Sequence, residues 1–289
     1  MKYRLIAIDV DGTLVDSNQL VAPETQDAIR HAQDRGIQIC IATGRSMKET
    51  LPVWRQLPLS DPPLPMAVIG GAMVCDPVTQ RTLYHRPIDL EVALELDAVL
   101  AAAGHSSLAF VDGWRHDADY YFGENGNGEA AMEMWFSKMN VRIRRGASLR
   151  SMPDMPAPMR INAVASAQEA TSLARELAER FAGRLVIHSL LAPNYGVYVV
   201  EAFHPQADKY RAVAYIAQGL RIPTAAIAAI GDDVNDIPML SQCGLGATFP
   251  HACQQVRDCS RHIVTDSLAN FIRQVADDVD GAGMVGFGS

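Results

Sequence analysis

Apolar runs of strand length alternate with helical segments at both ends of this 289-residue sequence. In the first third, strands are predicted at Leu5–Val10, Ile37–Gly44 and Met66–Val74, and a helix at Pro23–Arg35. Strands and helices that alternate at this spacing form parallel βαβ units, whose sheets are covered on both faces. We therefore predict an α/β fold with a Rossmann-like parallel-sheet core.

The last third repeats the pattern, with predicted helices from Lys209 and over Val234–Gln242, and a strand in "AIAAIGDD". The middle third instead mixes strands and helices around a turn-rich aromatic passage, "DGWRHDADYYFGENGNGEAAMEMWF". A chain of this length exceeds one ordinary compact core. We predict a catalytic core formed by 1–86 together with 193–289, and an inserted α+β cap domain at 87–192.

Composition narrows the function classes. The formal net charge is -8 and no block of consecutive Lys or Arg occurs, which argues against nucleic acid as a partner. No apolar run approaches the ~20 residues of a membrane span. Five scattered cysteines do not form a disulfide framework. We expect a cytoplasmic protein without membrane association, either a monomer or a small homo-oligomer.

The first predicted strand ends in Asp9, and a second acid follows at Asp11. A carboxylate at the end of a buried strand costs several kcal/mol unless something pairs with it. Three further motifs share this placement beside predicted strand ends: "ATGR" at 42–45, Lys209 at the start of a helix, and "GDDVND" at 231–236. Because ligands bind at the carboxyl ends of parallel strands, these motifs are expected to converge on one site.

On "DVDGT", "ATGR", Lys209 and "GDDVND", in this order, the sequence resembles the haloacid dehalogenase superfamily. The roughly 100-residue insert between the second and third motifs is similar to that of its Cof-like phosphatase branch. The resemblance implies a Mg²⁺-dependent phosphatase that hydrolyses a small phosphorylated metabolite, such as a sugar phosphate or a phosphorylated cofactor, through an aspartyl phosphate. One departure is Gly70 in "IGGA", where the family usually has Asn; we expect it to affect substrate range.

The resemblance also implies roles for individual residues. Asp9 would be the nucleophile and Asp11 the general acid and base, and two such carboxylates need environments that separate their pKa values. The Mg²⁺ site would comprise Asp9, the backbone carbonyl of Asp11, Asp232 and, through water or by orienting the lysine, Asp236. The remaining residues would contact the phosphoryl group or substrate: Lys209, Thr43, Gly12, Gly44, Arg45 and Asn235.

Alternative interpretations remain at this point. A sugar phosphomutase of the same superfamily would share the core and the cap style, and a non-catalytic metabolite-binding protein is the alternative from another class. A zinc site in "HACQQVRDCSRH" is disfavoured, because a helix there would not place all four ligand candidates on one face: His251, Cys253, Cys259 and His262.

Overall fold

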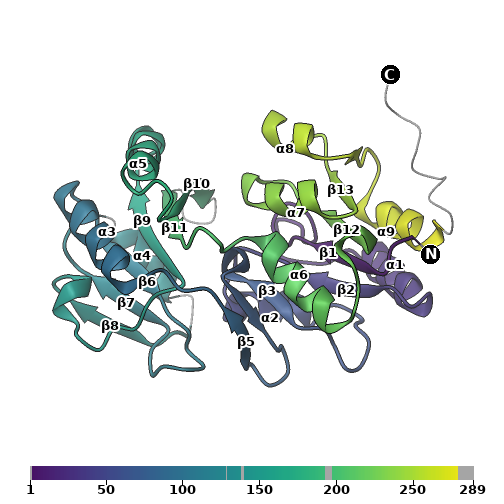
Figure 1. Ribbon diagram of the computed structural model, residues 1–289, viewed down its shortest axis with the longest axis horizontal. Coiled ribbons are helices and arrows are strands. Elements are labelled where there is room, and N and C mark those ends of the chain that lie inside the picture. The colour runs from purple at the N-terminus through teal and green to yellow at the C-terminus, as the bar shows by residue number, and fades with distance from the viewer. Residues whose placement is uncertain (1, 128, 138–139, 193–196, 279–289) are drawn as a thin grey trace. The chain divides into compact units, whose positions relative to one another are not determined.

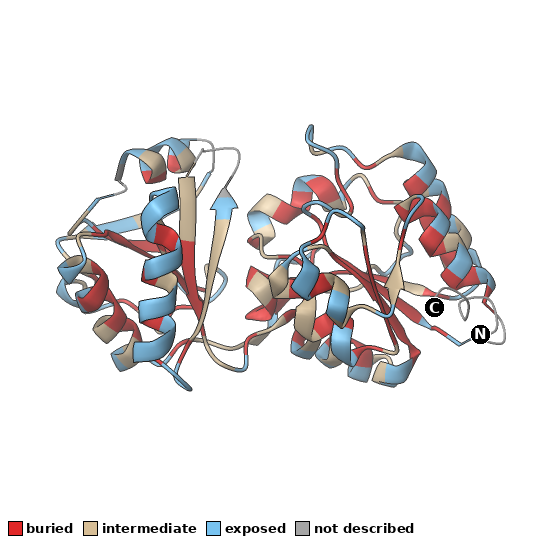
Figure 2. Cartoon of the chain, turned by 90° about the horizontal axis from the view of Figure 1, so that it is seen from above, coloured by how far each residue is buried: buried red, intermediate tan, exposed pale blue. Residues whose placement is uncertain are grey.

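The structure is a computed structural model, in which residues 2–127, 129–137, 140–192 and 197–278 are described (Figure 1). The chain folds into two compact units. Unit 1 consists of Met1–Tyr84 and Ala207–Ser289, and unit 2 of His85–Gln206. The strands at the centre of each large sheet are mostly buried and those at its edges less so, whereas the helices alternate buried and exposed faces (Figure 2). Among the described residues, no helix combines the length and apolar character needed to cross a membrane.

Unit 1 is built on a five-stranded parallel sheet, which confirms the predicted α/β class. Its strand order is β14 (His262–Ile263), β13 (Leu245–Thr248), β12 (Ile227–Ile230), β1 (Leu5–Ile8) and β2 (Gln38–Ile41). Every residue of β1 and β12 is buried, as expected for strands covered on both faces. The register pairs Ile8 with both Ile230 and Ile41. The carboxyl ends of β12, β1 and β2 therefore lie level with one another.

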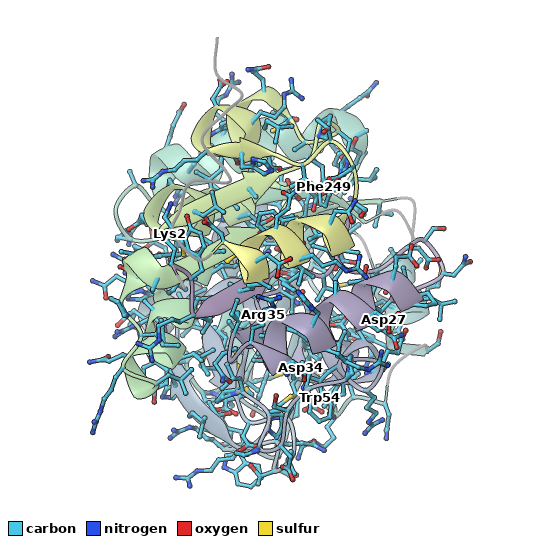
Figure 3. All side chains as sticks on the ribbon, turned by 90° about the vertical axis from the view of Figure 1, so that its right-hand side faces the viewer. Lys2, Asp27, Asp34, Arg35, Trp54 and Phe249 are labelled. Atoms are coloured by element: carbon cyan, nitrogen blue, oxygen red, sulfur yellow. The ribbon has the colours of Figure 1, made fainter. Side chains whose placement is uncertain are left out.

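Helices cover this sheet. Helices α1 (Pro23–Asp34) and α9 (Leu268–Asp277) pack against each other and run side by side in Figure 3, where Asp27 and Asp34 mark α1. Helices α6 (Lys209–Gly219), α7 (Ile237–Gln242) and α8 (Gln254–Cys259) share an apolar cluster with Ala7 and Ala229 of the sheet. Helix α2 (Met47–Trp54) begins with a capping box between Ser46 and Glu49.

The single strand predicted over Met66–Val74 is wrong. The chain forms β3 (Met66–Val68), a 3₁₀ turn over Ile69–Gly71, and β4 (Met73–Cys75), which pairs antiparallel with β3 and adjoins β5 (Thr82–His85). The reversal occurs because Ile69, Gly70 and Gly71 have φ values of 51°, 62° and 89°. Glycine adopts this left-handed region at low cost, so Gly70 and Gly71 suit the turn.

Unit 2 contains a six-stranded mixed sheet. The strand order is β10 (Val186–Ala192), β11 (Val197–Phe203), β9 (Arg160–Ala165), β6 (Ser107–Phe110), β7 (Tyr120–Gly123) and β8 (Ile143–Gly146). Its neighbouring strands are antiparallel except β7 and β8. Helices α3 (Leu90–Ala102) and α5 (Ala167–Arg180) contribute to its core cluster with Ala109, Ile161 and Val200. This is the predicted α+β insertion.

Two features of unit 2 differ from the sequence analysis. Strand β11 pairs with β10 and β9, so this unit continues to Gln206 rather than ending at 192; residues 193–196, where the core was expected to resume, lie outside the described residues. The passage read as turns contains β7 and helix α4 (Glu129–Ser137). Aromatic packing stabilises these two elements, because Tyr120 of β7 packs edge-on against Trp135 of α4.

Candidate active site

Three acidic side chains meet at the carboxyl ends of β1 and β12. Asp9 directly follows β1, and Asp232 and Asp236 belong to the turn and the short 3₁₀ helix (Val234–Asp236) after β12. One carboxylate oxygen from each lies within 4.8 Å of the others. Asp9 and Asp236 are 4% and 0% exposed. Two elements more than 200 residues apart in sequence thus build one buried acidic cluster.

Lys209 lies within this cluster. It is the first residue of α6 and is 1% exposed. Its Nζ donates to Asp9 Oδ1 and to Asp236 Oδ1, each at 2.6 Å. The N-cap Asp208, whose carboxylate accepts from the Arg211 amide at 2.8 Å, fixes the start of the helix. The lysine is therefore held in one position by the carboxylates on either side of it.

Asp236 orients its surroundings through both oxygens. Oδ1 accepts from Lys209, and Oδ2 accepts from the backbone amides of Asp232 and Asp233, each at 3.1 Å. Gly231 makes this approach possible, since a Cβ there would lie 2.3 Å from Asp236 Cγ. This geometry favours the predicted role of Asp236 as the group that orients the lysine.

Asp232 is positioned by residues that follow β1. Thr13 Oγ1 donates to Asp232 Oδ1 at 3.0 Å. Gly12 has φ +73°, and a Cβ on it would lie 2.2 Å from Asp232 Oδ2. Any side chain at position 12 would therefore displace this carboxylate. The sequence predicts a phosphate contact for Gly12, whereas the role of Thr13, which stands in the quoted motif, is not predicted.

The electrostatics of the cluster are unbalanced, because three carboxylates face one ammonium. Burial raises the pKa of the Asp9 carboxyl well above its ordinary value, and Lys209 opposes this. Burial also raises the pKa of Asp232, against the hydrogen bond from Thr13. Burial lowers the pKa of Lys209, but Asp236 and Asp9 together raise it by more, so the lysine stays charged. The excess negative charge favours a further cation.

A second group of predicted residues follows β2. Thr43 is fully buried, and its Oγ1 accepts from the Arg45 amide at 3.1 Å. A Cβ on Gly44 would lie 3.6 Å from Asn235 Nδ2, so the turn after β2 approaches the motif after β12. Within the described part of the chain, Asn235 Oδ1 is buried and has no hydrogen-bond partner. An unsatisfied buried acceptor of this kind indicates room for a donor or a cation.

Asp11 and Arg45 pair with each other. Arg45 Nε donates to Asp11 Oδ2 at 2.8 Å, and its Nη2 contacts Asp11 Oδ1 and Gln19 Oε1. The Asp11 side chain is 61% exposed and does not belong to the acidic cluster. The structure therefore brings Asp9, Lys209, Asp232 and Asp236 together, and places the Asp11 carboxylate in a separate ion pair.

The donor set fits a hard divalent cation. Carboxylate oxygens are the ligands that Mg²⁺ prefers, and three of them converge here on a site with excess negative charge. Gly12 leaves space for Asp232 where a Cβ would stand. Among the described residues, the four ligand candidates of the zinc alternative do not form a group that could hold a metal ion.

Comparison with known proteins identifies the family. The sequence model of the haloacid dehalogenase-like hydrolases matches residues 6–272. Pyridoxal phosphate phosphatase YbhA of Escherichia coli is 25% identical, over 94% of this chain and 98% of its own. The 5-amino-6-(5-phospho-D-ribitylamino)uracil phosphatase YcsE of Bacillus subtilis is 24% identical, over 93% and 94%. A haloacid dehalogenase-like hydrolase from B. subtilis has a similar structure, with a TM-score of 0.73 and 23% identity over 95% and 98% of the two chains.

This chain therefore belongs to the haloacid dehalogenase-like hydrolases. The resemblance noted from its four motifs is confirmed, and with it the expectation of an enzyme of the phosphatase type.

Proposed function

We propose that this protein is a Mg²⁺-dependent phosphatase that hydrolyses a small phosphorylated metabolite through an aspartyl phosphate on Asp9. The observation that carries the proposal is the position of Asp9. Its carboxylate is buried, is held by Lys209 at 2.6 Å, and lies within 4.8 Å of two further carboxylates. A buried acid with such neighbours is a typical nucleophile for phosphoryl transfer, where positioning and charge neutralisation dominate.

In the first half-reaction, an Asp9 carboxylate oxygen attacks phosphorus. The bond between phosphorus and the ester oxygen breaks, and Asp11 donates a proton to the departing oxygen. Lys209 and the Thr43 hydroxyl neutralise charge on the phosphoryl oxygens. Arg45 pairs with Asp11 in the structure, so the guanidinium has to exchange this carboxylate for substrate before Asp11 can act.

In the second half-reaction, water attacks the phosphorus of the aspartyl phosphate. Asp11, now ionised, accepts a proton from that water, the bond between phosphorus and Asp9 breaks, and inorganic phosphate leaves. Bound Mg²⁺ would supply charge neutralisation to the phosphoryl group and keep Asp9 ionised despite burial. Asp9, Asp232 and the Asp11 carbonyl would hold it, with Asp236 fixing the lysine beside it.

We assign the selection of substrate to unit 2, which corresponds to the predicted cap domain. One row of its sheet carries polar side chains, since the register pairs Asn162 with Glu201 and Glu201 with His188. Arg160 Nη1 contacts Glu201 Oε1 at 2.9 Å, and Asn162 Oδ1 is buried without a partner among the described residues. Named relatives act on pyridoxal phosphate and on a phosphorylated ribityl-uracil. These names support a metabolite that joins a phosphate to a polar ring, for which such a row offers donors and acceptors.

A screen of phosphorylated metabolites for phosphate release tests the proposal. We expect release that requires Mg²⁺, needs no bisphosphate activator, and is lost in Asp9→Asn. Transfer of the phosphoryl group to a sugar would indicate a phosphomutase. Absence of turnover of every ester, with Mg²⁺ bound, would indicate a binding protein.

A second measurement tests the assignment of substrate choice. Asn162→Ala should raise KM for the best metabolite while leaving kcat/KM for p-nitrophenyl phosphate unchanged. An equal effect on both substrates would remove this row from substrate selection.

A further inference from the structure

The loop between β13 and α8 places a histidine beside the acidic cluster of unit 1. His251 Nε2 lies 3.5 Å from Asp232 Oδ2, and its side chain is 58% exposed. None of the roles assigned above involves this residue. The zinc alternative grouped it with Cys253 and His262, but Cys253 is the exposed N-cap of α8 and His262 is a residue of β14. The imidazole instead approaches the Asp232 carboxylate, at a distance longer than that of an ordinary N–H···O hydrogen bond.

Contacts on both sides of His251 fix this loop. The Phe249 ring, labelled in Figure 3, stacks on the imidazole with centroids 5.3 Å apart and planes 11° apart. Arg257 of α8 donates to the carbonyl of Pro250 at 3.1 Å and also to that of Ala252. The Ala252 amide donates to the Phe249 carbonyl at 3.1 Å, which closes a turn. A solvent-exposed imidazole is thus held in a defined place by its own loop.

The two oxygens of Asp232 have different neighbours. Thr13 donates to Oδ1 at 3.0 Å, and His251 stands at Oδ2. Gly12 prevents any clash at Oδ2, where a Cβ would lie 2.2 Å away. A carboxylate that ligates a cation loses affinity when it is free to rotate about its Cβ–Cγ bond. Groups that fix the orientation of a ligand therefore contribute to cation affinity, and their removal typically costs about 10–100-fold.

We propose that His251 is a positioning residue for Asp232, and that its Nε2–H, together with the Thr13 hydroxyl, sets the plane in which this carboxylate meets the cation. The inference rests on the proposed function only in taking Asp232 as a cation ligand. A neutral imidazole has one N–H, and this role places it on Nε2. His251 acts here as a hydrogen-bond donor, so a neutral amide with the same reach should replace it.

Cation binding without substrate tests the proposal. Mn²⁺ affinity is measured by paramagnetic resonance, and Mg²⁺ affinity by calorimetry, for the wild type, His251→Ala, His251→Gln and Asp232→Ala. We expect His251→Ala to weaken both affinities by about 10-fold or more, and His251→Gln to remain within about threefold of the wild type, because the glutamine Nε2 reproduces the donor. His31→Ala is the matched control, since it removes another His–Asp contact of unit 1, to Asp277 at 2.9 Å, and should change neither affinity.

The outcomes separate this inference from the proposed function. If Asp232→Ala binds cations as the wild type does, the metal assignment itself fails. If Asp232→Ala abolishes binding but His251→Ala leaves it unchanged or tighter, only the role of His251 is overturned. If His251→Gln is as weak as His251→Ala, the donor explanation is wrong. Circular dichroism and the melting temperature confirm that each variant is folded.

Discussion

Replacing Lys209 with methionine removes the ammonium that lies between Asp9 and Asp236 while keeping most of the length of the side chain. At an effective dielectric constant of about 20, each Nζ–O distance of 2.6 Å corresponds to about 6 kcal/mol of attraction. Burying the ammonium costs several kcal/mol, which offsets much of this. The variant, however, keeps two buried carboxylates with no cation between them. Breaking a buried pair in this way costs about 3–5 kcal/mol of the free energy of unfolding.

Urea unfolding of the metal-free protein measures this loss, with Lys48→Met as the control, because Lys48 is exposed on α2. In the wild type the pKa of Lys209 is raised. The stabilisation that its charge gives the folded state is therefore complete below the ordinary lysine pKa of about 10.4 and is lost only at higher pH. The variant should regain stability relative to the wild type as pH falls, because protonation relieves the unpaired acids. If Lys209→Met unfolds at the same urea concentration as the wild type, the buried ion pairs do not stabilise the fold as argued.

Three further predictions follow from the site. Asp11→Asn should slow hydrolysis of alkyl phosphates by about 10²–10⁴ and that of p-nitrophenyl phosphate far less, because nitrophenolate leaves without a proton; equal losses would remove Asp11 from the acid role. Gly12→Ala should lower the free energy of unfolding by about 1–2 kcal/mol, because residue 12 has a left-handed φ. The variant should also bind Mg²⁺ more weakly in calorimetry, and an unchanged affinity would show that Gly12 is not needed to position Asp232. Mg²⁺ affinity should rise with pH and binding should release protons, since burial raises the pKa of Asp9 and Asp232; an affinity independent of pH would contradict those shifts.

The sequence predicts the parallel core well because buried strands and amphipathic helices follow local periodicity. Helix α1 begins at Pro23 and helix α6 at Lys209, both as expected. Where the prediction fails, long-range pairing decides the structure. Strand β11 is defined by its pairing with β10 and β9, which the sequence around it does not show. Met66–Val74 reads as one apolar run because positive φ values are not visible in composition.

The acidic cluster could be predicted because its members occupy recognisable motifs at strand ends. Two of the side-chain contacts around them could not. His251 reaches Asp232 from a loop that precedes α8, in a stretch where the sequence predicts a helix. The contact depends on how α8 and β13 pack. The ion pair between Asp11 and Arg45 joins two motifs whose side-chain directions are set by the tertiary fold. Motifs identify the chemistry, whereas the orientation of each group depends on packing.

The central claim is that Asp9 becomes phosphorylated during turnover, and the stereochemistry at phosphorus tests it most directly. A substrate monoester made chiral at phosphorus with sulfur and oxygen isotopes is hydrolysed in isotopically labelled water, and the configuration of the released thiophosphate is determined. Attack by Asp9 followed by attack of water gives two inversions, so the account predicts overall retention. This readout does not require the intermediate to accumulate. Inversion at phosphorus would mean that water attacks the substrate directly, and it would contradict the role of Asp9 as nucleophile.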